Sequence, residues 1–92
     1  MATMDDQFRE KSKKMKEMKV ATTDEDKLTL YKLYKQSTIG NCNIPPPSVL
    51  NVTARAKYMN WNSMTGTSQL DAQTAYCAYV DELVARLPET SE

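Results

Sequence analysis

The sequence predicts an all-α protein, a small four-helix bundle built from 92 residues. Four segments place apolar residues at the three- and four-residue steps of an amphipathic helix, and no stretch alternates like a half-buried strand. Residues that break helices separate these segments. The chain is long enough for one small domain with a thin core, so we expect a single domain over residues 1–92.

The first helix is predicted over about residues 4–19. Thr3, followed by Asp5 and Asp6, suits a helix start, because a short polar side chain caps free N–H groups and early acids favour the helix dipole. Lys and Arg surround a narrow apolar stripe. That stripe consists of Met4, Phe8, Met15 and Met18.

The second helix is predicted over about residues 24–39. Thr23 and Asp26 have the spacing of a capping box, and Gly40 is a natural stop. The three prolines at 45–47 cannot continue a helix and force an extended connection. The second and third helices therefore need not form a simple antiparallel hairpin. The apolar stripe of the second helix is formed by Leu30, Leu33 and Tyr34.

The third helix is predicted over about residues 53–64 and is ended by Gly66. Ala54, Tyr58 and Trp61 share one face, and we expect the two aromatic residues to pack inward.

The fourth helix is predicted over about residues 68–87, from a Ser68 to Asp71 capping box to the stop at Pro88. Three- and four-residue steps make a long seam on this helix. Its members are Ala72, Ala75, Tyr76, Tyr79, Val80, Leu83 and Leu87.

The composition excludes several classes of function. Lys plus Arg and Asp plus Glu are balanced at 12 each, so the chain is not a polycation made for nucleic acid. It has no His, and Cys42 and Cys77 match no metal-ligand spacing, so we expect no metal site and no cofactor. No nucleophile has an obvious activating base. The sequence therefore favours a protein that is not an enzyme.

No run of apolar residues is long enough to cross a membrane, and no export signal is visible. We expect a cytoplasmic protein, with both cysteines as free thiols of a reducing compartment; the alternative at the level of sequence is one disulfide between them. Basic residues crowd the first helix: Arg9, Lys11, Lys13, Lys14, Lys16 and Lys19. Such a cluster is most often a solvated helix face, but it is also compatible with a membrane-surface helix or with part of an anion site.

The second helix carries a more specific feature. Tyr31 and Lys35 are i, i+4 neighbours on a helix, and an aromatic face beside an ammonium suits a nucleotide, which needs a stacking surface and a cation for a phosphate. Lys57 and Tyr58 repeat the pairing on the third helix. The alternative is that the tyrosines border the core while the lysines extend into solvent.

Three motifs together resemble the acyl-CoA-binding protein family. The first, over residues 28–40, ends in Tyr-Lys-Gln-Ser-Thr-Ile-Gly; the second is Ala-Lys-Tyr-x-x-Trp at 56–61; the third begins at Gly66-Thr-Ser and continues to Tyr76. Their order and spacing match the family without gaps from about Phe8 to Leu87. The resemblance implies an up-down-down-up bundle that binds medium- to long-chain fatty acyl-CoA esters without catalysis, buffering and transporting them inside the cell.

The resemblance also implies residue roles. Tyr31 and Lys35 meet the adenine and the ribose 3′-phosphate, and Lys57 adds a second cation to that phosphate. Tyr34 lines the same pocket, while Lys16 reaches another phosphate. The complete set of expected acyl-CoA-binding residues is Phe8, Lys16, Tyr31, Lys32, Tyr34, Lys35, Lys57 and Tyr76.

Some positions depart from the family pattern. Lys11 and Ser12 stand where small residues are common, and Lys27 replaces a usually apolar residue at the rim of the acyl bowl. We expect a monomer whose partner is a long-chain acyl-CoA ester, with no nucleic acid and no stable membrane insertion. The alternative is a helical membrane-surface or protein-interaction module without a small ligand.

Overall fold

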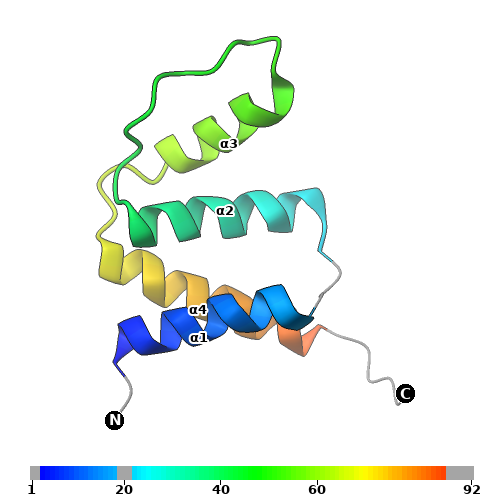
Figure 1. Cartoon of the computed structure of the whole chain (residues 1–92), viewed down its shortest axis with the longest axis vertical. Coiled ribbons are helices and arrows are strands. Elements are labelled where there is room, and N and C mark those ends of the chain that lie inside the picture. Colours follow the sequence, from blue (N-terminus) through cyan, green and yellow to red (C-terminus); the bar gives the residue numbers. More distant parts are fainter. Residues whose placement is uncertain (1–2, 19–21, 87–92) are drawn as a thin grey trace.

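The computed structural model describes residues 3–18 and 22–86, which contain four helices and no strand (Figure 1). The helices are α1 (Met4–Met18), α2 (Asp24–Thr38), α3 (Val52–Asn62) and α4 (Gln69–Ala85). The four predicted helices are thus confirmed, with ends that shift by one or two residues. Lys19, Leu87 and the side chain of Met18 lie outside the described part of the chain.

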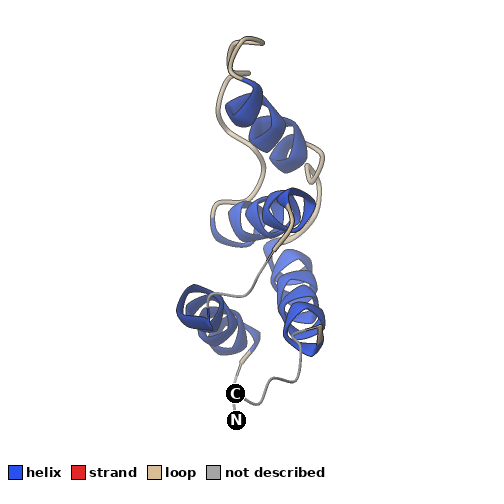
Figure 2. Cartoon of the chain, turned by 90° about the vertical axis from the view of Figure 1, so that its right-hand side faces the viewer, coloured by secondary structure: helices blue, strands red, loops and turns tan. Residues whose placement is uncertain are grey.

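The helices run up, down, down and up, as expected. In Figure 1, α1 and α4 run in one direction, whereas α2 and α3 run in the opposite direction and are therefore parallel to each other. Helix α2 packs against both α3 and α4, and α1 packs against α4. Seen along the helices in Figure 2, α3 and α2 form the upper part, while α1 and α4 lie side by side below them.

Side-chain caps explain where the helices begin. Thr23 and Asp26 form the predicted capping box at α2, with both hydrogen bonds at 3.0 Å. Asn51 caps α3 by accepting a 3.1 Å hydrogen bond from a backbone N–H three residues later, so α3 begins at Val52 and not at residue 53. At α4, Ser68 accepts a 3.0 Å bond from the N–H of Asp71.

Polar contacts attach the end of α2 to α3 and to the segment between α3 and α4. Gly40 has φ 100°, a conformation that glycine adopts without strain and that ends α2. Its carbonyl accepts a 2.8 Å hydrogen bond from the indole N–H of Trp61. The fully buried Gln36 donates from its amide nitrogen to the carbonyl of Thr67 at 2.7 Å and to Oδ1 of Asn41 at 3.0 Å. These bonds orient α3 and the start of α4 against α2.

The core lies along the inner face of α4, against which α1 and α2 pack. Its buried apolar residues are Phe8, Leu33, Trp61, Ala72, Tyr76, Cys77, Val80 and Leu83. One member of the predicted seam was wrong, because Ala75 is exposed and Cys77 occupies a core position in its place. Residues 75 and 77 lie about 100° from residue 76 on opposite sides of the helix, and the packing of α4 covers the side that carries Cys77. Tyr58 is only half-buried, unlike Trp61.

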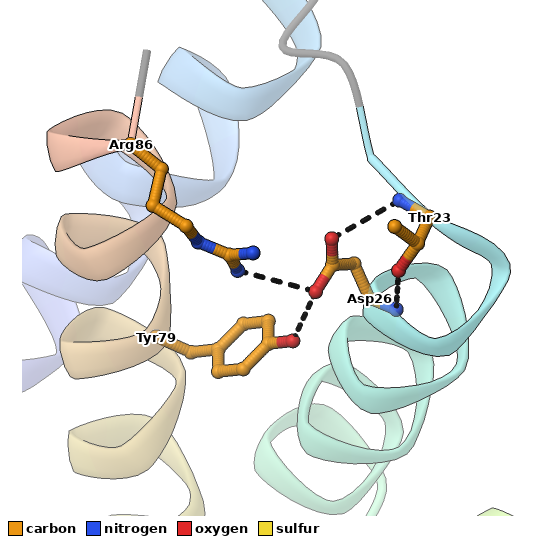
Figure 3. Close-up of polar contacts among 4 residues, drawn as sticks. All are labelled: Thr23, Asp26, Tyr79 and Arg86. Carbon is orange, nitrogen blue, oxygen red and sulfur yellow. Dashed lines mark hydrogen bonds and ion pairs between the residues drawn. The ribbon is translucent and has the colours of Figure 1, made fainter.

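A polar network joins the first turn of α2 to the end of α4 (Figure 3). Asp26 is 5% exposed, and its carboxylate accepts hydrogen bonds from the Tyr79 hydroxyl, from Arg86 Nη2 at 3.2 Å and from the N–H of Thr23 at 3.0 Å. The bond from Tyr79, together with those from Thr23 and Arg86, holds the pKa of Asp26 well below its ordinary value of 3.8. The same bond raises the pKa of Tyr79.

The Asp26 network predicts a pH-dependent contribution to stability. Because the pKa is lowered in the folded state, the carboxylate stabilises the fold above the unfolded pKa near 3.8, and this contribution is lost as the pH falls below that value. Asp26→Asn is expected to lower the thermal midpoint at pH 7 by about 5–10 °C, with a smaller difference from the unmodified protein at pH 2.5.

Thermal unfolding followed by circular dichroism at the two pH values measures the effect. The control is Asp24→Asn, which removes an exposed acid from the same first turn of α2. An equal loss in both variants would show that the helix dipole, and not the network, accounts for the stabilisation.

Candidate functional site

Two ammonium groups from different helices meet at one tyrosine ring. Lys35 Nζ lies 5.8 Å and Lys57 Nζ lies 5.5 Å from the centroid of the Tyr31 ring. Tyr31 and Lys35 come from adjacent turns of α2, whereas Lys57 comes from α3. Partial burial raises the pKa of Tyr31. The face of a neutral tyrosine ring attracts cations. The arrangement concentrates positive charge beside a flat aromatic surface.

The ring of the buried Trp61 on α3 also contacts the Lys35 ammonium group. Trp61 is 1% exposed, and Lys35 Nζ also lies 5.4 Å from its ring centroid. The indole is held in place by its hydrogen bond to Gly40. Trp61 therefore packs inward, as its position on the helix predicts, and it also helps to position the Lys35 ammonium.

Three aromatic rings form a second cluster between α1, α2 and α4. Phe8 stacks on Tyr34 with ring centroids 5.7 Å apart, and it meets Tyr76 edge to face at 4.9 Å. The Tyr34 and Tyr76 centroids are 6.1 Å apart. Burial raises the pKa of Tyr76. Such pairs add to the hydrophobic stabilisation and give the floor of the site a defined shape.

An apolar cleft of about 340 Å³, here called the first cleft, opens between α1 and α2 above these rings. Tyr31 lines it, so the first cleft shares this residue with the pair of ammonium groups. Lys16 is the cation at its α1 edge. The residues that line the first cleft are Ser12, Met15, Lys16, Leu30, Tyr31, Tyr34 and Tyr76. A hydrocarbon chain would be shielded from water here, next to groups that attract phosphate.

A second cleft, of about 620 Å³, adjoins the first and is more polar. Phe8 and Tyr34 form its wall towards the core, and Lys13 and Lys16 are at its α1 side. A third cleft, of about 300 Å³, lies between the first turns of α2 and α3. It is lined by Asp24, Lys27, Leu28, Val52, Thr53, Ala56 and Lys57. Lys57 thus stands between the Tyr31 ring and the third cleft.

The structure brings most of the predicted site residues together. Tyr31, Tyr34, Tyr76 and Lys16 line one cleft, Phe8 lines the adjoining one, and Lys35 and Lys57 flank the Tyr31 ring. Lys32 lies on α2 but does not line any of the three clefts. Its role in ligand binding stays a prediction.

The structure gives Lys11 and Leu30 more specific places than the sequence did. Lys11 forms an ion pair with Asp81 of α4, which raises the pKa of Lys11, so its ammonium faces α4 and not the first cleft. Leu30 lines the first cleft, although the sequence suggested only that it belongs to the apolar stripe of α2. Its four-residue spacing from Tyr34 was the available signal.

Catalytic and metal-binding groups are scarce in the described structure. Within residues 3–18 and 22–86, no group of three or more His, Cys, Asp or Glu side chains could hold a metal ion. The acids that line the clefts are Asp5, which pairs with Arg9 at 3.1 Å, and Asp24. Cys42 and Cys77 are free thiols, and burial raises the pKa of Cys77, which keeps it protonated.

Residues 5–80 match the sequence model of the family described as acyl CoA binding protein. The chain belongs to the acyl-CoA-binding protein family. It is 42% identical over 79 residues to the acyl-CoA-binding protein of Dictyostelium discoideum, a match that covers 86% of this chain and 94% of that one. It is 38% identical over 79 residues to the acyl-CoA-binding protein of Saccharomyces cerevisiae, covering 86% and 91%.

Solved structures of acyl-CoA-binding proteins agree with this assignment. The crystal structure of Oryza sativa acyl-CoA-binding protein 2 has a TM-score of 0.88 at 30% identity and covers 98% of this chain and 100% of its own. The crystal structure of the Moniliophthora perniciosa protein has a TM-score of 0.85 at 27% identity and covers 94% and 83%. The predicted family and the predicted bundle are both confirmed.

No helix in the described part of the chain is long and apolar enough to cross a bilayer.

Proposed function

We propose that this protein binds medium- to long-chain fatty acyl-CoA esters and carries and buffers them without catalysis. The observation that supports this most directly is the pair of ammonium groups at the Tyr31 ring, next to an apolar cleft, in a member of the acyl-CoA-binding protein family. The two features match the two halves of the ligand. A CoA head presents an adenine and phosphates, and an acyl chain presents hydrocarbon.

Lys35 and Lys57 neutralise the ribose 3′-phosphate, and the Tyr31 ring stacks on the adenine. A hydrogen bond to a charged group contributes about 1.5–3 kcal/mol. Each methylene that leaves water contributes about 0.8 kcal/mol, up to the length that the apolar clefts accommodate. Because both terms act on one molecule, tight binding requires the head and the tail together.

The remaining residues support these contacts. Lys16, at the α1 edge of the first cleft, reaches a second phosphate, and Lys32 adds positive charge on α2. Phe8, Tyr34 and Tyr76 form the floor against which the ligand packs. The ligand is the only small molecule the proposal requires, and no cofactor takes part. The absence of His from the chain and the scarcity of acids in the clefts support a non-catalytic role.

The whole chain, residues 1–92, acts as one monomeric acyl-CoA-binding domain, which the family match over residues 5–80 supports. Two free thiols are compatible with a reducing, cytoplasmic setting. A detergent-like ester kept in a protein cleft cannot disrupt membranes, which is the value of such a carrier. Family membership favours this role over a helical interaction module without a small ligand.

Titration calorimetry with palmitoyl-CoA, CoA and palmitate tests the proposal. We expect palmitoyl-CoA to bind at least about a hundredfold more tightly than either palmitate or CoA alone, because each of these lacks one set of contacts. CoA is the control for the head and palmitate is the control for the tail. Equal affinities for palmitate and palmitoyl-CoA would contradict the proposal, since the cations at Tyr31 would then contribute nothing.

A further inference from the structure

The third cleft combines an apolar wall with charged groups. Leu28 of α2 and Val52 and Ala56 of α3 supply the apolar atoms. The remaining residues of the lining carry a charge or a hydroxyl group: Asp24, Lys27, Thr53 and Lys57. The volume of about 300 Å³ lies at the lower end of the range for small-molecule sites. The cleft therefore suits a short stretch of hydrocarbon that ends near polar groups.

Lys57 connects this cleft with the site proposed for the CoA head. Its ammonium group lies 5.5 Å from the centroid of the Tyr31 ring, and the same residue lines the third cleft. Helices α2 and α3, which form the cleft, pack side by side (Figure 1). A ligand whose ribose 3′-phosphate is held at Lys57 can therefore place another part of the same molecule in the third cleft. This step rests on the proposed function, which supplies the head.

Lys27 is an exposed cation that has no ion-pair partner among the residues that the structure describes. The ion pairs in that part of the chain join other residues, which are Arg9 with Asp5, Lys11 with Asp81 and Arg86 with Asp26. Asp24 lies three residues before Lys27 on α2, a spacing that allows a pair, but the two side chains do not form one. With Lys57, the cleft has two ammonium groups and one carboxylate, which leaves an excess of one positive charge.

A plain hydrocarbon chain uses only part of this surface. Its methyl end offers no acceptor to Lys27, so the lysine has to extend its ammonium group into solvent. A chain that ends in a carboxylate supplies the missing acceptor, and the hydroxyl of Thr53 adds a second donor at the same cleft. Asp24 opposes the carboxylate, but the dipole of α2 already favours its charge, because it lies in the first turn.

We propose that this protein accepts fatty acyl-CoA esters whose acyl chain ends in a carboxylate, and that Lys27 determines this specificity. The CoA head is held at Tyr31, the methylenes at the end of the chain lie along the apolar wall of the third cleft, and the terminal carboxylate pairs with Lys27. Lys57 is engaged by the phosphate, so Lys27 is the cation left for the chain end. Without a cation, a carboxylate at an apolar wall would lose hydration and gain nothing in return.

Titration calorimetry at pH 7, where a terminal carboxyl group is ionised, tests the proposal. Two esters of equal chain length are compared: palmitoyl-CoA and the mono-CoA ester of hexadecanedioic acid. We expect the unmodified protein to bind both esters far more tightly than CoA alone. Lys27→Met retains an unbranched side chain without the charge. It should weaken the binding of the diacid ester by about fivefold, the size expected for a solvent-exposed ion pair, without weakening that of palmitoyl-CoA.

Two control variants make the test specific. Lys27→Arg keeps the charge and should bind the diacid ester as the unmodified protein does. Lys14→Met removes an exposed cation of α1 that lines none of the clefts, and it should leave the ratio of the two affinities unchanged. Circular dichroism of each variant should show the helical content of the unmodified protein, because both lysines are exposed.

The possible outcomes separate this inference from the proposed function. The inference is wrong if Lys27→Met changes both affinities equally, if Lys14→Met reproduces its effect, or if Lys27→Arg fails to retain the binding. It is also wrong if palmitoyl-CoA binds tightly while the diacid ester binds no better than CoA, a result that leaves the proposed function intact. If neither ester binds, the proposed function fails, and the specificity assigned to Lys27 fails with it.

Discussion

Replacing Lys35 or Lys57 with alanine is expected to weaken the binding of palmitoyl-CoA by about 1.5–3 kcal/mol, which is roughly ten- to a hundredfold. Both ammonium groups lie within 5.8 Å of the Tyr31 ring centroid, although they come from different helices. If they contact one phosphate, the loss of either leaves that group underneutralised. The free energy of unfolding should change little, because neither lysine is buried.

Two further measurements make this prediction specific. The double variant should lose less than the sum of the single losses, because contacts to one phosphate are coupled. Both losses should shrink for a dephospho-CoA ester, which lacks the 3′-phosphate. Calorimetry with both esters measures these differences.

Lys14→Ala is the control, because Lys14 is an exposed cation of α1 that lines none of the clefts. If Lys14→Ala weakened binding as much as the other two substitutions, the affinity would depend on diffuse positive charge and the assigned site would be wrong.

Replacing Trp61 with alanine is expected to have the largest effect on stability, a loss of about 3–5 kcal/mol in the free energy of unfolding. The indole is 1% exposed and is the buried side chain of α3, which packs against α2. Because the total free energy of unfolding of a small domain is itself small, such a loss removes a large fraction of it. The change should also weaken acyl-CoA binding, because α3 carries Lys57.

A milder variant separates packing from the hydrogen bond. Trp61→Phe retains most of the aromatic packing but removes the donor to the Gly40 carbonyl, so it should cost only about 0.5–1.5 kcal/mol through that bond. Urea denaturation of the two variants, with Met59→Ala as an exposed control on the same helix, measures the difference. A loss in Trp61→Ala no larger than that in Met59→Ala would show that α3 is not held by its tryptophan.

Much of the fold could be predicted from the sequence because it depends on neighbours along the chain. The capping box of Thr23 and Asp26 spans three residues, and Gly40 ends α2 through its own backbone conformation. The pairing of Tyr31 with Lys35 follows from one turn of helix. The resemblance to a known family, which rests on motifs spread over the chain, indicated the up-down-down-up directions of the helices and the expected ligand.

The contacts that the sequence left undetermined join residues far apart along the chain. Asp26 looked like a helix-capping acid, and only the packing of α2 on α4 brings it to Tyr79 and Arg86. Packing likewise directs Lys11 to Asp81 and leaves Ala75 exposed.

At the candidate site, the sequence by itself determined that Tyr31 and Lys35 share a helix face. Only the tertiary structure decided that Lys57 reaches the same ring, that Trp61 lies beneath Lys35 and that a cleft opens between α1 and α2. The physical reason is that helical periodicity sets which side of a helix is apolar, but not which partner covers it. That choice depends on the fit of whole helix surfaces, to which residues from every part of the chain contribute.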